Sequence, residues 1–135
     1  MRTPTLIAAF ALTLAGALSL AACSYLWTYK YEVSVAADVS LDAGATLIMA
    51  QAPGDAGIDT IEDPKEATTS ADTRDYQDEG QVCCGPTETV SLYAFLDLND
   101  NGSWDGGEPW GADPNNPVTI EDDSYVSTIV VENDG

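Results

Sequence analysis

Residues 87–98, with the sequence T-E-T-V-S-L-Y-A-F-L-D-L, constrain the fold more than any other stretch of the chain. Side chains of a β-strand point alternately to its two faces, and here both faces would be largely apolar. One face would carry Val90, Leu92, Ala94 and Leu96, and the other Ser91, Tyr93 and Phe95. A strand that is apolar on both faces is typical of the interior of a sheet. We therefore predict a central strand over residues 87–98.

Shorter segments with alternating apolar residues lie on both sides of this strand, and turn-forming residues separate them. The alternation predicts strands over residues 29–35, 45–51, 117–120 and 125–132. No segment after residue 23 has a strong helical pattern. Several short strands separated by turns are typical of an antiparallel β-sandwich, so we predict an all-β domain.

Residues 55–82 interrupt this pattern, because they contain many acidic and few apolar side chains. They are expected to form a long acidic loop. A loop of this length is unusual inside a compact domain. Two alternatives remain open: a mobile loop, or a loop that holds a short edge strand near Glu66–Thr73.

The N-terminus has the pattern of a secretory signal segment, in which a basic residue, Arg2, precedes an apolar run from Leu6 to Ala22. The run ends in Leu20-Ala21-Ala22-Cys23, which resembles the lipobox of bacterial lipoproteins. That resemblance implies cleavage before Cys23, attachment of lipid to Cys23 and a membrane anchor. In a Gram-negative cell, Ser24 as the next residue would also imply the outer membrane, because it is not Asp. The alternatives are an ordinary secretory signal with a chance cysteine, or an uncleaved anchor.

Residues 1–22 are thus predicted to be a lipoprotein signal peptide, and residues 23–135 a single β-sandwich domain. The 135-residue chain has 23 acidic and four basic residues and a formal net charge of −19, so it lacks the basic surface that nucleic acid requires. The chain has no histidine, and two of its three cysteines, Cys83 and Cys84, are adjacent. Adjacent cysteines cannot join distant segments. They form either a strained disulfide or two thiols on opposite faces of a strand.

The central strand leads directly into the acidic segment D-L-N-D-N-G-S-W-D-G-G-E. Calcium prefers six to eight oxygen ligands, and the twelve-residue EF-hand loop supplies them at positions 1, 3, 5, 7, 9 and 12, with glycine at position 6. Gly102 falls at position 6, and Ser103 would contribute its backbone carbonyl. The predicted ligands are Asp97, Asn99, Asn101, Ser103, Asp105 and Glu108. The alternative is an acidic turn without metal, since Asp, Asn and Gly all favour turns.

Residues Phe95–Gly111 resemble the calcium loops of bacterial surface β-sandwich modules, such as the B-type repeats of Gram-positive adhesins. They are also similar to segments of transthyretin-like and carboxypeptidase-regulatory-like domains. The resemblance implies an immunoglobulin-like or transthyretin-like β-sandwich with a calcium loop between strands. Pro109 follows Glu108 immediately, and therefore no helix is expected to continue from the last ligand.

These features predict a membrane-anchored, calcium-stabilised lipoprotein of the cell envelope, which acts as a structural module or binds an envelope protein or glycan. An alternative is a small-ligand carrier or a subunit of an envelope complex, with the acidity reflecting salt adaptation. For that alternative an exposed apolar patch would be the sign, and its candidate residues are Tyr25, Leu26, Trp27 and Trp110. A carboxylate-based hydrolase is the least favoured alternative, because the best-organised carboxylates already match the metal pattern. We therefore expect no enzyme.

Overall fold

A computed structural model describes residues 25–41 and 44–134 of the chain. The predicted signal segment, residues 1–22, and Cys23 lie outside the described residues. The elements are β1 (Leu26–Val35), β2 (Thr46–Pro53), a 3₁₀ helix η1 (Ile58–Thr60), β3 (Glu62–Thr68), β4 (Asp75–Cys83), β5 (Glu88–Asp97), β6 (Trp110–Ala112), β7 (Val118–Ile120) and β8 (Val126–Val131). Within the described ranges, no helix has the length and apolar character needed to cross a membrane.

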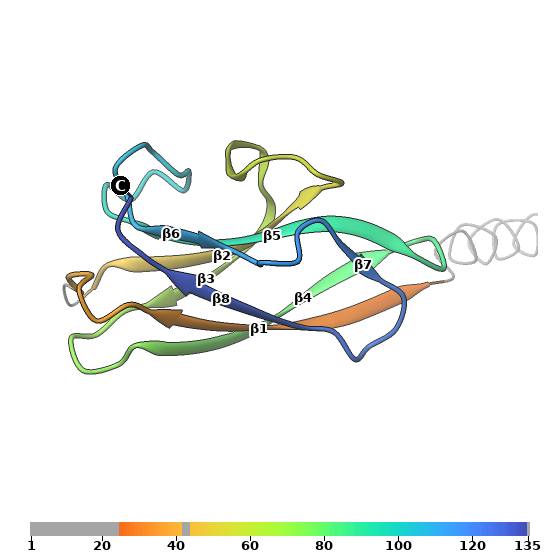
Figure 1. The fold of residues 1–135 in the computed structure, drawn as a ribbon, viewed down its shortest axis with the longest axis horizontal. Helices are drawn as coiled ribbons and strands as arrows, with labels where there is room; N and C mark the ends of the chain where they lie inside the picture. The colour runs from red at the N-terminus through yellow and green to blue at the C-terminus, as the bar shows by residue number, and fades with distance from the viewer. Residues whose placement is uncertain (1–24, 42–43, 135) are drawn as a thin grey trace, which may run out of the picture.

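The strands form two sheets that pack against each other, which confirms the prediction of an all-β sandwich (Figure 1). The smaller sheet has the order β4-β1-β8, and the larger has the order β3-β2-β5-β6, with β7 also paired to β5. Every pair of strands is antiparallel except β1 and β8, which run parallel. Parallel neighbours need a long connection, and here the connection from β1 to β8 consists of the strands β2 to β7.

The predicted central strand is confirmed as β5, which pairs with β2 along one edge and with β6 and β7 along the other. Every residue of β5 from Val90 to Asp97 is buried. The side chains of Leu92 and Leu96 face the core between the sheets, whereas Tyr93 and Phe95 belong to a second apolar cluster on the opposite face. The sequence pattern therefore identified both faces correctly.

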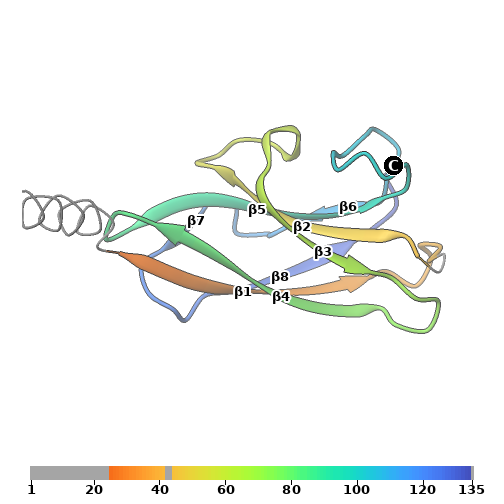
Figure 2. The same cartoon turned by 180° about the vertical axis from the view of Figure 1, so that it is seen from behind.

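The prediction of a long loop over residues 55–82 was wrong, because η1, β3 and β4 occupy most of this segment. The alternative with an edge strand near Glu66–Thr73 was partly right, since its first three residues belong to β3. Strands β3 and β4 lie at the edges of the two sheets, and both are visible from the side shown in Figure 2. An edge strand pairs with one neighbour and can expose most of its side chains, and charged residues there prevent pairing with other chains. The acidic side chains therefore suit these strands. Because they replace apolar residues, the alternation that predicts a strand is weak in this part of the sequence. Cys83 and Cys84 are both exposed at the end of β4.

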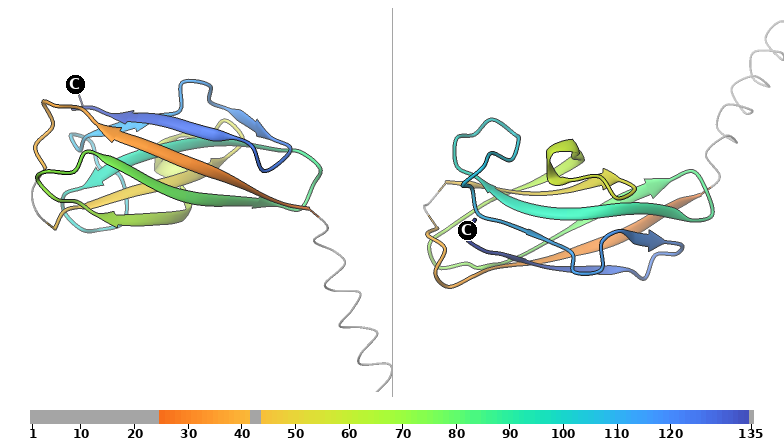
Figure 3. Two further views of the ribbon diagram at one scale, coloured as in Figure 1. Left: turned by 90° about the horizontal axis from the view of Figure 1, so that it is seen from below. Right: turned by 45° about the horizontal axis from the view of Figure 1, so that its top comes forward.

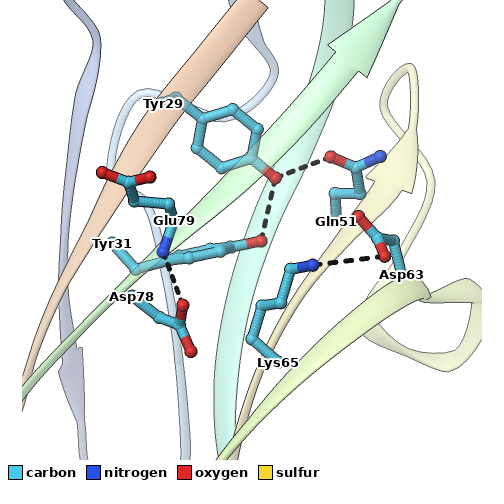
Figure 4. Close-up of polar contacts among 7 residues, drawn as sticks. All are labelled: Tyr29, Tyr31, Gln51, Asp63, Lys65, Asp78 and Glu79. Carbon is cyan, nitrogen blue, oxygen red and sulfur yellow. Dashed lines mark hydrogen bonds and ion pairs between the residues drawn. The ribbon is translucent and has the colours of Figure 1, made fainter.

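The core between the sheets contains a polar contact of two tyrosines and a glutamine among its apolar side chains (Figure 4). The hydroxyl of Tyr29 donates a hydrogen bond to Oε1 of Gln51 at 2.6 Å and lies 3.0 Å from the hydroxyl of Tyr31. Burial raises the pKa of Tyr29 to about 12, and it also raises the pKa of Tyr31. Gly80 on β4 leaves space for this arrangement, because a Cβ atom there would lie 2.3 Å from the Tyr29 ring. The contact links β1 of the smaller sheet to β2 of the larger.

Candidate metal centre

A second apolar cluster lies on the face of the larger sheet that points away from the smaller one. We call it the outer cluster; its buried members are Ile48, Ala50, Ala52, Ile58, Tyr93 and Phe95. Two connections project from this face, the segment that contains η1 and the loop between β5 and β6 (Figure 1 and Figure 3). Half-buried residues of both, Ile61 and Trp104, pack against the cluster. The outer cluster is therefore covered by loops and not by a second sheet.

The loop over residues 98–109 contains most of the predicted calcium ligands, and Trp104 fixes it to the outer cluster. The indole of Trp104 packs against that of Trp110, with ring centroids 5.7 Å apart. Its Nε1 donates a hydrogen bond to the carbonyl of Glu108 at 3.1 Å. Trp104 thus joins the middle of the loop to its last residues, where the chain returns to the sheet.

Asp97 is the last residue of β5 and the first predicted ligand. Its side chain is 3% exposed and accepts two backbone hydrogen bonds, at Oδ1 from the N–H of Asn101 (3.2 Å) and at Oδ2 from the N–H of Gly102 (2.8 Å). These bonds bend the chain back towards the strand. Asp100 and Gly102 both have positive φ angles, 57° and 77°, as this tight turn requires.

Glu108, the last predicted ligand, is 5% exposed and joins the two ends of the loop. Its Oε2 accepts a hydrogen bond from the N–H of Leu98 at 2.6 Å, and its Oε1 accepts one from the N–H of Asp105 at 2.7 Å. The backbone N–H of Glu108 donates in turn to the carbonyl of Asp105 at 3.0 Å. One carboxylate therefore holds the first residue of the loop and a residue in its second half.

The remaining predicted ligands form a second, exposed group. Oδ2 of Asp105 accepts hydrogen bonds from the side-chain amides of Asn99 (2.9 Å) and Asn101 (2.7 Å). Oδ1 of Asn101 accepts one from the N–H of Ser103 at 3.0 Å. The structure thus brings all six predicted residues into one hydrogen-bonded loop. Their acidic side chains do not converge, however, and across the described ranges no three Asp, Glu or Cys side chains gather closely enough to share a metal ion.

The two buried carboxylates at the ends of this segment, those of Asp97 and Glu108, have no basic partner in the part of the chain that the structure describes. The one ion pair among the described residues joins Lys65 to Asp63, with Nζ 3.5 Å from Oδ1. Arg74 instead donates hydrogen bonds to backbone carbonyls. A buried charge without a counter-ion is costly, and only backbone N–H groups stabilise these two. A hard cation would suit the oxygen-only donors of the loop.

Sequence reasoning missed one residue that supports the loop, Asp134 near the C-terminus. Its Oδ2 accepts a hydrogen bond from the N–H of Gly107 at 2.8 Å, and its Oδ1 accepts one from Nε1 of Trp110 at 3.2 Å. An acidic residue 27 positions after Gly107 carries no local signal of this contact.

The residues predicted as candidates for an exposed apolar patch differ in exposure. Trp110 is half-buried, whereas Tyr25 and Leu26 are 40% and 58% exposed.

A last buried carboxylate, that of Asp113, lies outside the loop and is fully engaged. Its Oδ2 accepts hydrogen bonds from the hydroxyls of Tyr125 (2.6 Å) and Ser127 (2.7 Å), and its Oδ1 accepts one from the N–H of Asn115. Burial raises the pKa of Tyr125 to about 12. This network fixes the connection after β6 to β8, which is a structural role.

Comparison with known proteins gives no relative of this chain. No family model matches it, and neither a curated protein nor a solved structure matches it.

Proposed function

We propose that this protein is a calcium-stabilised, membrane-anchored domain of the bacterial cell envelope that acts as a structural or binding module. One observation carries the calcium part of the proposal. Asp97 and Glu108 are buried in a segment with EF-hand ligand spacing, and no basic side chain of residues 25–41 and 44–134 pairs with either. A divalent cation would compensate both charges at once.

The residues that would hold calcium are the side-chain oxygens of Asp97, Asn99, Asn101, Asp105 and Glu108, together with the carbonyl of Ser103. Calcium would supply the positive charge that these oxygens lack. To complete the set, the carboxylate of Asp105 must leave the amide nitrogens of Asn99 and Asn101, whose oxygens would then turn inward. Asp97 and Glu108 are already held in place by backbone hydrogen bonds. Metal binding would therefore reorganise the exposed half of the loop and leave the buried half unchanged.

A strand precedes this loop and a short strand follows it, in place of the helix pair of a sensor EF-hand. The opening motion of such sensors depends on a change of angle between helices. We therefore infer a structural calcium that fastens the loop over the outer cluster, and no catalytic role.

Anchoring is the second part of the proposal, and it rests on the lipobox-like Leu20-Ala21-Ala22-Cys23. Because β1 begins at Leu26, only two residues separate it from the proposed lipid attachment site. The domain would then lie close to the membrane surface, with the membrane as its first partner. An envelope protein or a glycan would be the second, and the outer membrane the location.

Isothermal titration calorimetry of the full chain in a non-ionic detergent tests the calcium site. We expect saturable binding of one calcium ion. Even partners that only orient a metal ligand cost about 10–100-fold in affinity when replaced, so Glu108→Gln is expected to lose at least about tenfold. Glu66→Gln, which makes the same charge change on the exposed face of β3, should bind like the wild type. Absence of binding, or equal losses in both variants, would refute the site.

Labelling cells with a palmitate analogue tests the anchor. The wild-type chain should become labelled and fractionate with membranes, and Cys23→Ala should lose the label. A labelled Cys23→Ala protein, or an unlabelled wild type, would remove the anchor from the proposal without affecting the calcium site.

A further inference from the structure

A groove of about 650 Å³ lies on the surface where β6 meets β8. The two sheets join at this position, because the N–H of Trp110 donates to the carbonyl of Glu132 at 2.9 Å and the N–H of Glu132 donates back at 3.1 Å. The groove is lined from β6 by Trp110, Gly111 and Ala112, and from β8 and the residues after it by Val130, Glu132 and Asp134. It therefore has one wall from each sheet.

Gly111 explains why β6 and β8 can approach so closely. A Cβ atom at this position would lie 2.0 Å from the carbonyl oxygen of Val130, so no larger residue fits without moving a strand. The groove therefore lies along a close seam between the two sheets.

Trp110 is one of the residues that line the groove, and its indole is held rigidly. Its ring packs against those of Trp104 and Tyr93, with centroids 5.7 and 6.5 Å away. Its Nε1 is fixed by Asp134, whose other oxygen accepts the hydrogen bond from Gly107. An aromatic ring that is already fixed loses little conformational entropy when a ligand binds.

The charged side chains of the groove are both acidic, Glu132 and Asp134, and both residues are exposed. The three basic residues that the structure describes are Lys30, Lys65 and Arg74, and none of them lines the groove. Arg74 donates to the carbonyls of Ala36 and Val39, and Lys65 pairs with Asp63. Anionic ligands would be repelled here, and cations would be attracted.

We propose that this groove binds a cationic side chain of a partner protein, an arginine or lysine in an exposed peptide segment. A tryptophan ring is the best aromatic partner for a cation, and the carboxylate of Glu132 can accept hydrogen bonds from a guanidinium. The apolar surface of Ala112 and Val130 suits the aliphatic part of such a side chain. The proposal goes beyond the calcium site and does not depend on it.

The test follows the indole N–H signal of Trp110 by NMR, in the full chain in non-ionic detergent at about 0.15 M salt. The signal is assigned by its loss in Trp110→Phe. The probe is acetyl-Gly-Arg-Gly-amide, and its neutral control replaces arginine with citrulline. The arginine peptide should shift the signal saturably, and the citrulline peptide should not.

Two substitutions in the groove locate the binding. Glu132→Gln should weaken binding of the arginine peptide about threefold, as expected for an exposed charge pair. Thr128 is a further exposed residue that lines the groove, and Thr128→Arg should block the groove with a cation of the chain itself. Glu66→Gln, on β3, should leave binding unchanged, and melting curves should show that all three variants are folded.

Three outcomes would overturn the proposal. Equal shifts with the arginine and citrulline peptides would show that charge is not recognised. An equal loss in Glu66→Gln and Glu132→Gln would show non-specific attraction to an acidic protein. A stronger shift with a neutral oligosaccharide than with the arginine peptide would assign the groove to glycans instead.

Discussion

The two faces of β5 bury similar apolar side chains under different covers. On one face, Leu92 and Leu96 pack against a second sheet, whose strands are held by continuous main-chain pairing. On the other face, Tyr93 and Phe95 are covered by loops, one of which contains two buried carboxylates without a basic partner. Because burial of apolar surface does not depend on ions, the first cover should be stable alone. The stability of the second cover, the loops, should depend on a cation that compensates the carboxylates of Asp97 and Glu108.

The largest effect is expected between the sheets. Leu92→Ala should lower the free energy of unfolding by about 2–5 kcal/mol, the usual range for emptying a filled core position, because Leu92 is fully buried. Urea denaturation should give the same loss in calcium and in chelator. Val126→Ala, at an exposed site on β8, is the control and should change stability by less than about 0.5 kcal/mol. A loss at Leu92 that depends on calcium would erase the distinction between the two faces.

Two glycines sharpen the comparison, one beside the core and one in the loop. Gly80→Ala should cost about 1–3 kcal/mol, because its Cβ would overlap the buried ring of Tyr29. Gly106→Ala is the matched change, since a Cβ there meets no atom within 4 Å. Thermal melting should show a loss in the first variant and almost none in the second. Equal losses of stability in the two variants would mean that the loss arises from the backbone conformation of glycine and not from the overlap with Tyr29.

Trp104→Leu tests the loop cover directly. The variant keeps an apolar side chain on the outer cluster but loses the hydrogen bond from Nε1 to the carbonyl of Glu108. We expect a loss of about 1–2 kcal/mol, measured by urea denaturation in calcium. Hydrogen exchange should increase at the N–H groups of Leu98 and Asp105, which bond to Glu108. Unchanged exchange there would show that the tryptophan does not fasten the loop.

The smallest expected effect concerns the tyrosine contact between the sheets. Tyr29→Phe should cost about 1 kcal/mol, because it removes the hydroxyl that bonds to Gln51. Tyr25→Phe, at an exposed ring, should cost almost nothing. Urea denaturation of both variants, each compared with the wild type, measures the difference. Equal stabilities in the two variants would contradict a stabilising role for the buried hydroxyl.

The same tyrosine makes stability depend on alkaline pH. Its pKa is raised to about 12 from an ordinary value near 10, so both states are protonated below about pH 10 and its contribution is complete there. As pH rises from about 10 to 12, the unfolded chain loses the proton first, and stability falls. Urea denaturation across this range should show a smaller fall in Tyr29→Phe. An equal fall of the unfolding free energy in Tyr29→Phe and the wild type would show that a group other than Tyr29 titrates.

The sequence was sufficient to predict the sandwich and its central strand, because alternation over residues 87–98 reports burial on two faces. It did not predict β4, and it offered an edge strand overlapping β3 only as an alternative, because edge positions allow acidic side chains to replace apolar ones. It also missed β6, a strand of three residues that is formed by pairing with β5 and β8. Such a strand has too few residues to show a period.

The candidate metal loop could be recognised in the sequence because its predicted ligands are close together and follow a fixed spacing. The structure places Asp97 and Glu108 in the buried half of the loop and Asp105 in the exposed half, a division that the spacing does not contain. The contact from Asp134 was not predictable, because it depends on where β8 ends relative to β6. A local pattern can indicate candidate ligands, whereas the contacts that support them depend on the topology of the sheets.

The most direct test of the central claim is the melting temperature of the full chain as a function of calcium. A ligand present at about 100 times its dissociation constant stabilises the folded state by about 2.7 kcal/mol, which corresponds to a shift of several degrees for a domain of this size. We predict a saturable rise in the wild type that is absent in Glu108→Gln and retained in Glu66→Gln. A melting temperature that does not respond to millimolar calcium would contradict the account, and the segment from Asp97 to Glu108 would then be an acidic turn.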